Sequence, residues 1–382
     1  MRTKVLFFTS ARSDYGLLKP LIEYLSGQPF FDVSILVSGA HFAEDQGMTY
    51  LEILSDGFQI DHKIDYLRTE RAKGDIIYAN AILQIEFNDY ISLNPKDLVI
   101  VLGDRSELIP IVSTAMLKGI PVAHISGGEI TEGSTDNQVR HAVTKMAHLH
   151  FTSTEEYKSN ILKMGEEEWR VCVSGEPGLD SISRLNYLSK DDLFDSIGLD
   201  IDKNTILSTF HSETIDNKIN SSFIQKLVTS ILEKNDCQII FTAANVDIGG
   251  EEINDTIELL ANKFQNVYFV KSLGKLKYYS MMKYAKVMIG NSSSGIVEAQ
   301  SFNLPVINVG KRQEGRLRNN NVIDVDVNLN QILNHLELIL NFNFETPANI
   351  NIYGSGNACA IISSFLQNVD LDKLNLKKST FN

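Results

Sequence analysis

Cysteine is scarce in this chain of 382 residues. The three cysteines, Cys172, Cys237 and Cys359, lie far apart and match no metal-binding spacing. Isolated thiols of this kind are typical of a reducing compartment, so we expect a cytoplasmic protein. Long apolar runs are also lacking. The run near the N-terminus is too short to span a bilayer and carries no signal-peptide cleavage pattern, so we expect no membrane partner.

Several common motifs are missing as well. No G-x-G-x-x-G follows the first apolar run, and the chain has no P-loop, no G-x-S-x-G and no H-x-x-x-H pattern. We therefore expect no nicotinamide or other cofactor, no ATP hydrolysis, no serine-hydrolase nucleophile and no metal. The formal net charge is -13. No strongly basic patch offsets it, which argues against a nucleic-acid partner.

The chain does contain a regular alternation of apolar runs and helical patterns, which is typical of parallel α/β sheets. In the first half the expected strands lie at 4–9, 32–37, 97–102, 120–125, 148–152 and 171–174. In the second half they lie at 205–210, 238–242, 267–270, 288–290 and 306–309. Helices are expected at 17–25, 107–117, 219–232, 251–264, 276–284, 328–340 and 354–366.

The length allows two domains, and the strand–helix pattern starts again after a crossover at 175–188. We therefore predict an α/β protein with two Rossmann-like domains, at 1–174 and 175–353. The terminal segment 354–382 is expected to pack back on the first domain.

Polar residues follow the expected strands in both halves of the chain. They are Arg12, His41, Asp104, Ser126, His211, Asn245 and Ser292. In parallel α/β sheets, ligands bind beyond the carboxyl ends of the strands. Because both halves contribute such residues, the sequence predicts an active site in the cleft between the two domains.

The stretch 288–316 predicts a strand, a loop of small residues, a helix and a second strand. Ser292 and Ser293 lie where that helix begins, and its free N–H groups together with the hydroxyls can bind a phosphate. Glu298, one turn further, can bind a ribose diol, and Arg312 in the following basic loop can neutralise a diphosphate. An ordinary strand–helix turn with serine caps explains the same residues equally well.

Three acids of the first half are candidates for proton transfer. Asp104 follows a strand, where it serves either as a general acid or base or as the cap of a helix that begins near Ser106. Asp136 and Arg140 lie one turn apart on an expected helix, and Glu129 precedes them. A solvated loop with a local ion pair is the simpler alternative for this group.

A set of motifs shared with known enzymes supports a more specific interpretation. The motifs are A-R-S-D-Y-G, G-D-R-S-E, H-I-S-G-G-E-x-T-x-G, R-H-A-V-T-K-M-A-H-L-H-F, G-N-S-S-S-G-I-V-E and N-V-G-K-R-Q-E-G-R. In their order over residues 7–318 they resemble the hydrolysing UDP-N-acetylglucosamine 2-epimerases of sialic-acid biosynthesis. They are also similar to sister enzymes that act on a 2,4-diacetamido UDP-sugar in legionaminic-acid biosynthesis. The resemblance implies a glycosyltransferase-B-like fold.

The resemblance implies that the protein converts UDP-N-acetylglucosamine and water into N-acetylmannosamine and UDP. Domain 1–174 then carries the catalytic acids, and domain 175–353 binds UDP. The residues at positions that hold UDP in the family are Arg12, Asn245, Ser292, Ser293, Glu298 and Arg312. Those at positions implicated in catalysis or in the sugar pocket are Asp104, Asp136, Arg140 and His211. Many family members self-associate, so a homodimer or homotetramer is expected.

Two departures from the family pattern bear on the substrate. Many members carry a glutamate at the position of Ser126, and that glutamate is a favoured acid or base. A serine hydroxyl carries no charge at neutral pH, so Glu129, Asp104 or water is expected to take that role. The loop before Asp136 is also one residue longer than in some sialic-acid enzymes. Both features resemble the legionaminic-acid branch.

The chemistry favours elimination over a free carbanion at C2, because the neighbouring amide is a weak electron sink. Loss of UDP builds positive charge on the ring, which acidifies the C2 hydrogen. Asp104 then removes that hydrogen and leaves a 2-acetamidoglycal. Water adds at C1, and Asp136 returns a proton to the opposite face of C2. Alternatives on the same architecture are a non-hydrolysing epimerase, a glycosyltransferase and a non-catalytic UDP-sugar sensor.

Overall fold

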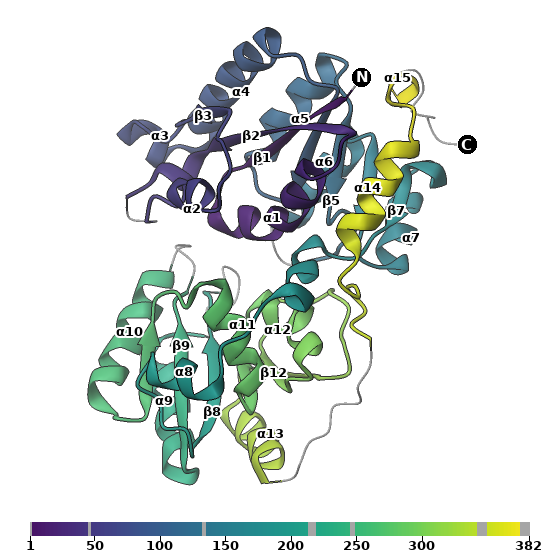
Figure 1. Ribbon diagram of the computed structural model, residues 1–382. Helices are drawn as coiled ribbons and strands as arrows, with labels where there is room; N and C mark the ends of the chain where they lie inside the picture. The colour runs from purple at the N-terminus through teal and green to yellow at the C-terminus, as the bar shows by residue number, and fades with distance from the viewer. Residues whose placement is uncertain are drawn as a thin grey trace. The chain divides into compact units, whose positions relative to one another are not determined.

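The chain divides into two compact units (Figure 1). Unit 1 comprises Met1–Glu129, Thr135–Ser183 and Ile352–Asn382, and unit 2 comprises Ile130–Ser134 and Arg184–Asn351. The computed structural model describes residues 2–44, 47–131, 135–212, 219–244, 249–341 and 350–374.

Within these ranges, unit 1 holds a seven-stranded parallel sheet in the order β3-β2-β1-β4-β5-β6-β7. Its strands are β1 (Thr3–Thr9), β2 (Phe31–Ser38), β3 (His62–Ile64), β4 (Leu98–Leu102), β5 (Val122–Ile125), β6 (Leu149–Thr152) and β7 (Val171–Val173). Its α-helices are α1 (Arg12–Ser26), α2 (Tyr50–Ser55), α3 (Glu70–Gly74), α4 (Ile76–Leu93), α5 (Leu108–Leu117), α6 (Thr135–Met146), α7 (Glu155–Lys163), α14 (Ala358–Asn368) and α15 (Leu371–Leu374). Short 3₁₀ turns are η1 (Gly39–Phe42), η2 (Glu168–Arg170) and η3 (Pro177–Arg184).

Alternate side chains of β1 pack on opposite faces of this sheet. Val5 and Phe7 belong to a buried cluster with apolar residues of α1 and α14, whereas Leu6 and Phe8 belong to a second cluster with α4 and α5. Burial on both faces explains why the strand is a continuous apolar run in the sequence. Although α1 and α14 lie far apart in the chain, they pack against each other (Figure 1).

Unit 2 holds a six-stranded parallel sheet in the order β10-β9-β8-β11-β12-β13 among its described residues. Its strands are β8 (Asn204–Thr209), β9 (Cys237–Thr242), β10 (Val267–Val270), β11 (Val287–Gly290), β12 (Val306–Val309) and β13 (Val322–Val325). Its helices are α8 (Lys190–Asp195), α9 (Ser221–Lys234), α10 (Gly250–Lys263), α11 (Gly274–Tyr284), α12 (Ser293–Val297), the 3₁₀ turn η4 (Ala299–Phe302) and α13 (Leu329–Asn341).

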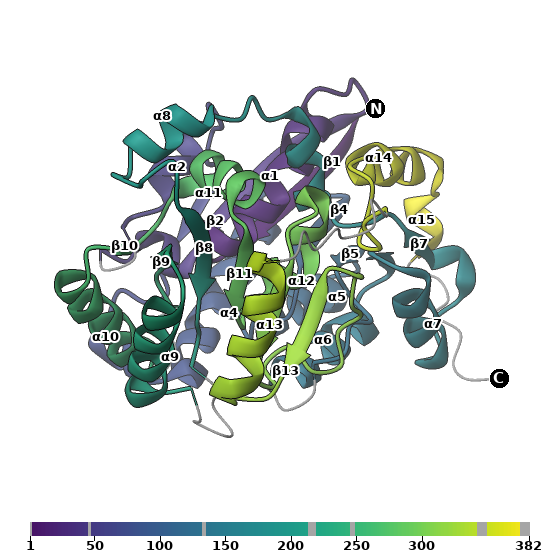
Figure 2. The same cartoon turned by 90° about the horizontal axis from the view of Figure 1, so that it is seen from below.

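One apolar core underlies the central strands of unit 2. Ile206 of β8, Ile239 of β9 and Ile289 of β11 are buried together with apolar residues of α9, α10 and α13. Figure 2 shows these strands side by side. Within the described part of the chain, no helix combines the length and the apolar character needed to cross a membrane.

The predicted fold class is confirmed, since both units are Rossmann-like and every expected strand is present with small shifts at its ends. Two local expectations were wrong. Helix α1 begins at Arg12, because the Asp14 carboxylate accepts the backbone N–H groups of Ser10 and Ala11 and fixes its first turn. Helix α12 has only five residues and passes into a 3₁₀ turn. Serine and glycine, which fill its first turn, are weak helix formers.

Candidate active site

In each sheet the strand order reverses at one place. Strands β1 and β4 meet there in unit 1, and β8 and β11 meet there in unit 2. The loops after two such strands run in opposite directions, and ligands of open α/β sheets bind at this switch point. Asp104 lies in the loop after β4, His211 follows β8, and Ser292 follows β11. The predicted site residues therefore lie at the switch points of the two sheets.

Asp104 forms an ion pair with the guanidinium of Arg140 on α6. Arg140 is 1% exposed, and its Nη1 also donates to the backbone carbonyl of Glu129 at 3.1 Å. One buried side chain thus connects the loop after β4 with the loop after β5. The N-cap of α5 is Glu107, so the alternative that Asp104 caps this helix is wrong.

The other two acids predicted in unit 1 lie in different surroundings. The Glu129 side chain is buried, whereas Asp136 is exposed in the first turn of α6. The structure therefore brings Asp104, Arg140 and the Glu129 backbone together, and it leaves Asp136 at the surface of the unit.

A polar network that the sequence analysis missed surrounds the loop after β4. Arg105 Nη2 donates to the Glu107 carboxylate at 3.2 Å, and the Tyr66 hydroxyl donates to the same carboxylate at 2.9 Å. Burial acts to raise the pKa of Glu107, but the Arg105 charge and the hydrogen bonds to the carboxylate, from the backbone, Tyr66 and Arg105, together lower it. Arg12 is exposed, and its Nε donates to Glu52 at 2.9 Å.

His124 of β5 supports the turn that carries Asp104. Its Nε2 lies 2.7 Å from the carbonyl oxygen of Gly103, and its Nδ1 lies 3.1 Å from the hydroxyl of Thr144. Burial lowers the pKa of His124 to about 3, so the ring is neutral at physiological pH. Gly103 has a φ of 85°, a left-handed conformation that glycine adopts without strain.

In unit 2, Asn291 joins the loops after β8 and β11. Its Oδ1 accepts the backbone N–H of His211 at 2.7 Å, and its Nδ2 donates to the His211 carbonyl at 2.8 Å. Arg312 and Gln313, in the loop after β12, donate to the Asn291 carbonyl at 3.2 and 3.0 Å. Burial, assisted by Arg312, lowers the pKa of His211 to about 3. The ring of His211 is therefore a neutral hydrogen-bonding group.

The predicted serines lie at the start of α12, where they are partly exposed. Ser292 is the N-cap, with its hydroxyl accepting the N–H of Ser294 at 3.4 Å, and Ser293 is the first helical residue. The Tyr278 hydroxyl lies 2.6 Å from the hydroxyl of Ser294. Hydroxyls and first-turn N–H groups together offer several donors to an anionic oxygen.

Glu298 lies at the C-terminal end of α12, and its Oε1 accepts the hydroxyl of Tyr279 at 2.8 Å. Burial raises the pKa of the Glu298 carboxyl, and the hydrogen bond from Tyr279 opposes this rise. The remaining predicted residue of this unit, Asn245, lies outside the described residues.

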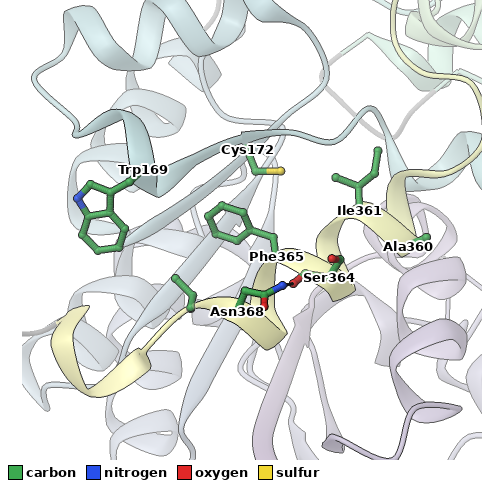
Figure 3. Close-up of a pocket in the computed structure, with 8 residues that line it drawn as sticks. Trp169, Cys172, Ala360, Ile361, Ser364, Phe365 and Asn368 are labelled. Carbon is green, nitrogen blue, oxygen red and sulfur yellow. Dashed lines mark hydrogen bonds between the residues drawn. The ribbon is translucent and has the colours of Figure 1, made fainter.

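An apolar groove of about 700 Å³ lies elsewhere on unit 1, beside β7 and α14 (Figure 3). It is lined by Trp169, Cys172, Ala360, Ile361, Ser364, Phe365, Asn368 and Val369. This lining contains no acidic or basic side chain and none of the predicted site residues, so we assign the groove no part in the chemistry.

The described part of the chain contains no group of three or more histidine, cysteine, aspartate or glutamate side chains placed to hold a metal ion. The groups at the switch points are carboxylates, neutral imidazoles, hydroxyls and guanidinium groups. They suit proton transfer in unit 1 and anion binding in unit 2.

The chain matches known proteins over most of its length. The family model described as UDP-N-acetylglucosamine 2-epimerase matches residues 23–367. The GDP/UDP-N,N'-diacetylbacillosamine 2-epimerase (hydrolyzing) of Campylobacter jejuni is 36% identical over 338 residues, which cover 88% of each chain. The UDP-N,N'-diacetylbacillosamine 2-epimerase (hydrolyzing) of Legionella pneumophila is 34% identical over 378 residues, which cover 99% of each chain.

A solved structure supports the fold. The UDP-GlcNAc 2-epimerase from Neisseria meningitidis bound to UDP-GlcNAc matches with a TM-score of 0.83 and 19% identity, over 97% of this chain and 100% of that one. This likeness shows a glycosyltransferase-B-like fold, as predicted. The family model and the two relatives show that the chain belongs to the hydrolysing branch of the UDP-N-acetylglucosamine 2-epimerase family.

Proposed function

We propose that this protein releases UDP from a UDP-2-acetamido sugar, inverts C2 and adds water at C1. The observation that carries the proposal is the pair of Asp104 and Arg140 at the switch point of unit 1. The buried guanidinium fixes the position of the carboxylate, and a carboxylate held at this edge of the sheet can serve as the base that removes a proton from carbon.

The favoured substrate is UDP-N,N'-diacetylbacillosamine, which is named for the Campylobacter jejuni and Legionella pneumophila relatives. Ser126 and the longer loop before Asp136 support this choice, because both depart from the sialic-acid pattern. UDP-N-acetylglucosamine is the second candidate, since the UDP-N-acetylglucosamine 2-epimerase of Neisseria meningitidis is 30% identical over 338 residues. With either substrate, the product serves nonulosonic-acid biosynthesis.

Unit 2 binds the UDP in this proposal. The hydroxyls of Ser292 and Ser293 donate to the diphosphate, and Arg312 balances its charge. The neutral ring of His211 donates to a diphosphate oxygen or orients water. The Glu298 carboxylate accepts the ribose hydroxyls. The two other residues assigned to UDP are Asn245 of unit 2 and Arg12 of unit 1.

Unit 1 supplies the acids and bases. As the C1–O bond breaks, its electron pair leaves with UDP, and Asp104 takes the C2 proton. The electrons of the C2–H bond form the C1–C2 double bond of a 2-acetamidoglycal. Asp136 then protonates the opposite face of C2 while water adds at C1. Glu129 contributes through its backbone carbonyl, which holds Arg140 in place.

The test is turnover of the purified protein in deuterated water, with each of the two UDP-sugars supplied separately. We expect one UDP per free sugar and one deuterium at C2 of the product, measured by proton NMR. An intact epimerised UDP-sugar would instead show a non-hydrolysing epimerase. Tight binding without UDP release from either sugar would show a sensor.

Self-association is part of the proposal. Helices α4 and α5 pack together, and they expose apolar side chains that a helix normally buries, with Ile77 76%, Ile85 63% and Leu117 77% exposed. A second copy of the chain covers them in a homodimer or homotetramer. Light scattering after size exclusion should show the assembly, and Ile77→Lys with Ile85→Lys should dissociate it. A wild-type monomer would contradict this part.

A further inference from the structure

Ser126 and Glu176 form a hydrogen-bonded pair that the roles above do not use. The Ser126 hydroxyl donates to both carboxylate oxygens of Glu176, at 3.0 and 2.9 Å. Ser126 follows β5, and Glu176 lies just beyond β7, 50 residues later. Both therefore lie at the same carboxyl edge of the sheet as Asp104.

Two features hold this pair in a fixed arrangement. The backbone N–H of Glu176 donates to the Tyr353 carbonyl at 2.8 Å, which fastens its loop to the segment before α14. Ser126 has a φ of 61°, a left-handed conformation that is costly for a residue with a Cβ. The strain is retained at the position where the hydroxyl reaches Glu176.

The two residues of the pair differ in how far they are exposed to solvent. Glu176 is 6% exposed, whereas Ser126 is partly exposed, so a ligand at this edge meets the hydroxyl first. A hydroxyl has one proton and two lone pairs. Since the proton of Ser126 points to Glu176, the outward side of its oxygen can only accept a hydrogen bond. A water molecule is such a donor.

The neighbouring strand places this acceptor close to the reacting atoms. Leu102 of β4 pairs with Ile125 of β5, and the Gly103 N–H donates to the Ile125 carbonyl at 3.0 Å. Asp104 directly follows Gly103, and Ser126 directly follows Ile125, in the two adjacent loops. A sugar whose C2 proton is taken by Asp104 therefore has its C1 within reach of the same edge.

Resting on the proposed function, we propose that Ser126 and Glu176 together accept the proton that the attacking water must lose. As water forms the C1–O bond, its proton passes to the Ser126 oxygen while the Ser126 proton passes to Glu176. The electron pair of the C1–C2 double bond takes a proton from the acid at C2. The net change is the addition of one water molecule to the glycal. Glu176 later returns its proton to solvent.

The test separates elimination from hydration in single variants, with UDP, glycal and free sugar measured by NMR for the same reaction. Glu176→Gln keeps the shape of the side chain and one oxygen that can accept from Ser126, but the amide accepts no proton. We expect it to release UDP together with 2-acetamidoglycal as the main product, while free sugar falls about 10²-fold or more. Ser126→Ala should shift the ratio the same way. In both variants, the fall of the hydration rate at low pH should become less steep.

Ser174→Ala is the matched control, because Ser174 is a buried hydroxyl of the same loop whose donor contacts, among the described residues, are the backbone carbonyls of Thr152 at 3.5 Å and Gly175 at 2.9 Å. It should keep the wild-type ratio of glycal to sugar. An unchanged ratio in Glu176→Gln or Ser126→Ala, or an equal fall of UDP and sugar in both, would overturn the pair's role and leave the proposed function standing. A wild-type chain that releases no UDP would overturn both.

Discussion

The side chain of Asn291 pairs with the backbone of His211 in the way that two β-strands pair. It accepts the N–H at 2.7 Å and donates to the carbonyl at 2.8 Å, across 80 residues of sequence. Its own carbonyl receives the side chains of Arg312 and Gln313. Through its side chain and its backbone carbonyl, the buried residue Asn291 therefore fixes three loops of unit 2 relative to one another.

Replacing Asn291 should weaken UDP binding through these loops. Asn291→Ala leaves a buried N–H and a buried carbonyl without their partner, which costs roughly 1–3 kcal/mol for each group. We expect UDP affinity, measured by calorimetry, to fall at least about 10-fold. Asn321→Ala is the control, because Asn321 is a buried amide of the same unit that donates to the Leu304 carbonyl. If both variants lose UDP affinity equally, the loss reflects general destabilisation.

Asp104→Asn should separate catalysis from binding. The change keeps the size of the side chain but removes the base, so turnover should fall about 10²–10⁴-fold while UDP affinity remains near wild type. The thermal midpoint should also fall, because Arg140 loses its charged partner in a buried setting. Glu52→Gln breaks the exposed pair with Arg12 and should change stability by less than about 1 kcal/mol. Loss of UDP affinity in Asp104→Asn would assign Asp104 a structural role.

The strands and the positions of the site loops could be predicted from the sequence because both are local signals. A strand buried on two faces is a continuous apolar run, and Asp104, His211 and Ser292 follow such runs directly. The topology then brings these loops to the switch points, because parallel strands place all their carboxyl ends at one edge.

The partners of these residues could not be predicted, because they depend on contacts between distant segments. Nothing near Asn291 in the sequence indicates His211, and nothing near Ser126 indicates Glu176. The sequence around Asp104 also could not decide its role, since a carboxylate after a strand suits both a helix cap and an ion pair. The choice depends on Arg140, which reaches this loop only when α6 packs beside α5.

Tyr279→Phe should change the pH dependence of UDP binding. Burial raises the pKa of Glu298, and the hydrogen bond from Tyr279 lowers it. Without the phenol hydroxyl the pKa rises further, so the carboxylate that binds the ribose is lost at a higher pH. The acidic midpoint of UDP affinity should therefore move upward. Tyr278→Phe removes a hydroxyl that contacts Ser294 and should leave this midpoint in place. A downward shift in Tyr279→Phe would contradict the assignment of Glu298.

Stability should fall on mild acidification because of buried neutral histidines. Burial lowers the pKa of His41 to about 4 and that of His124 and His211 to about 3. Unfolded histidine titrates near pH 6.5, so between roughly pH 6.5 and 4 only the unfolded chain binds these protons. Each of these histidines then lowers the free energy of unfolding by about 1.4 kcal/mol for every pH unit by which the pH falls. Urea unfolding at pH 7 and pH 5 measures how the free energy of unfolding depends on pH. His124→Gln should reduce the number of protons taken up on unfolding by about one. A free energy of unfolding that stays constant over this range would be contrary to expectation.

Gly290 should tolerate no side chain, because it lies directly against the backbone of Thr209 in β8. A Cβ at Gly290 would overlap the backbone carbonyl of Thr209, and neither strand can move without breaking the sheet next to His211 and Asn291. Gly290→Ala should therefore lower the thermal midpoint strongly and abolish UDP binding together with it. Gly16→Ala is the matched change, since a Cβ on this residue of α1 meets no atom within 4 Å. It should raise stability by about 0.5–1 kcal/mol, because alanine favours the helix. Equal thermal midpoints for the two variants would show that β8 and β11 can move apart at this point without loss of stability.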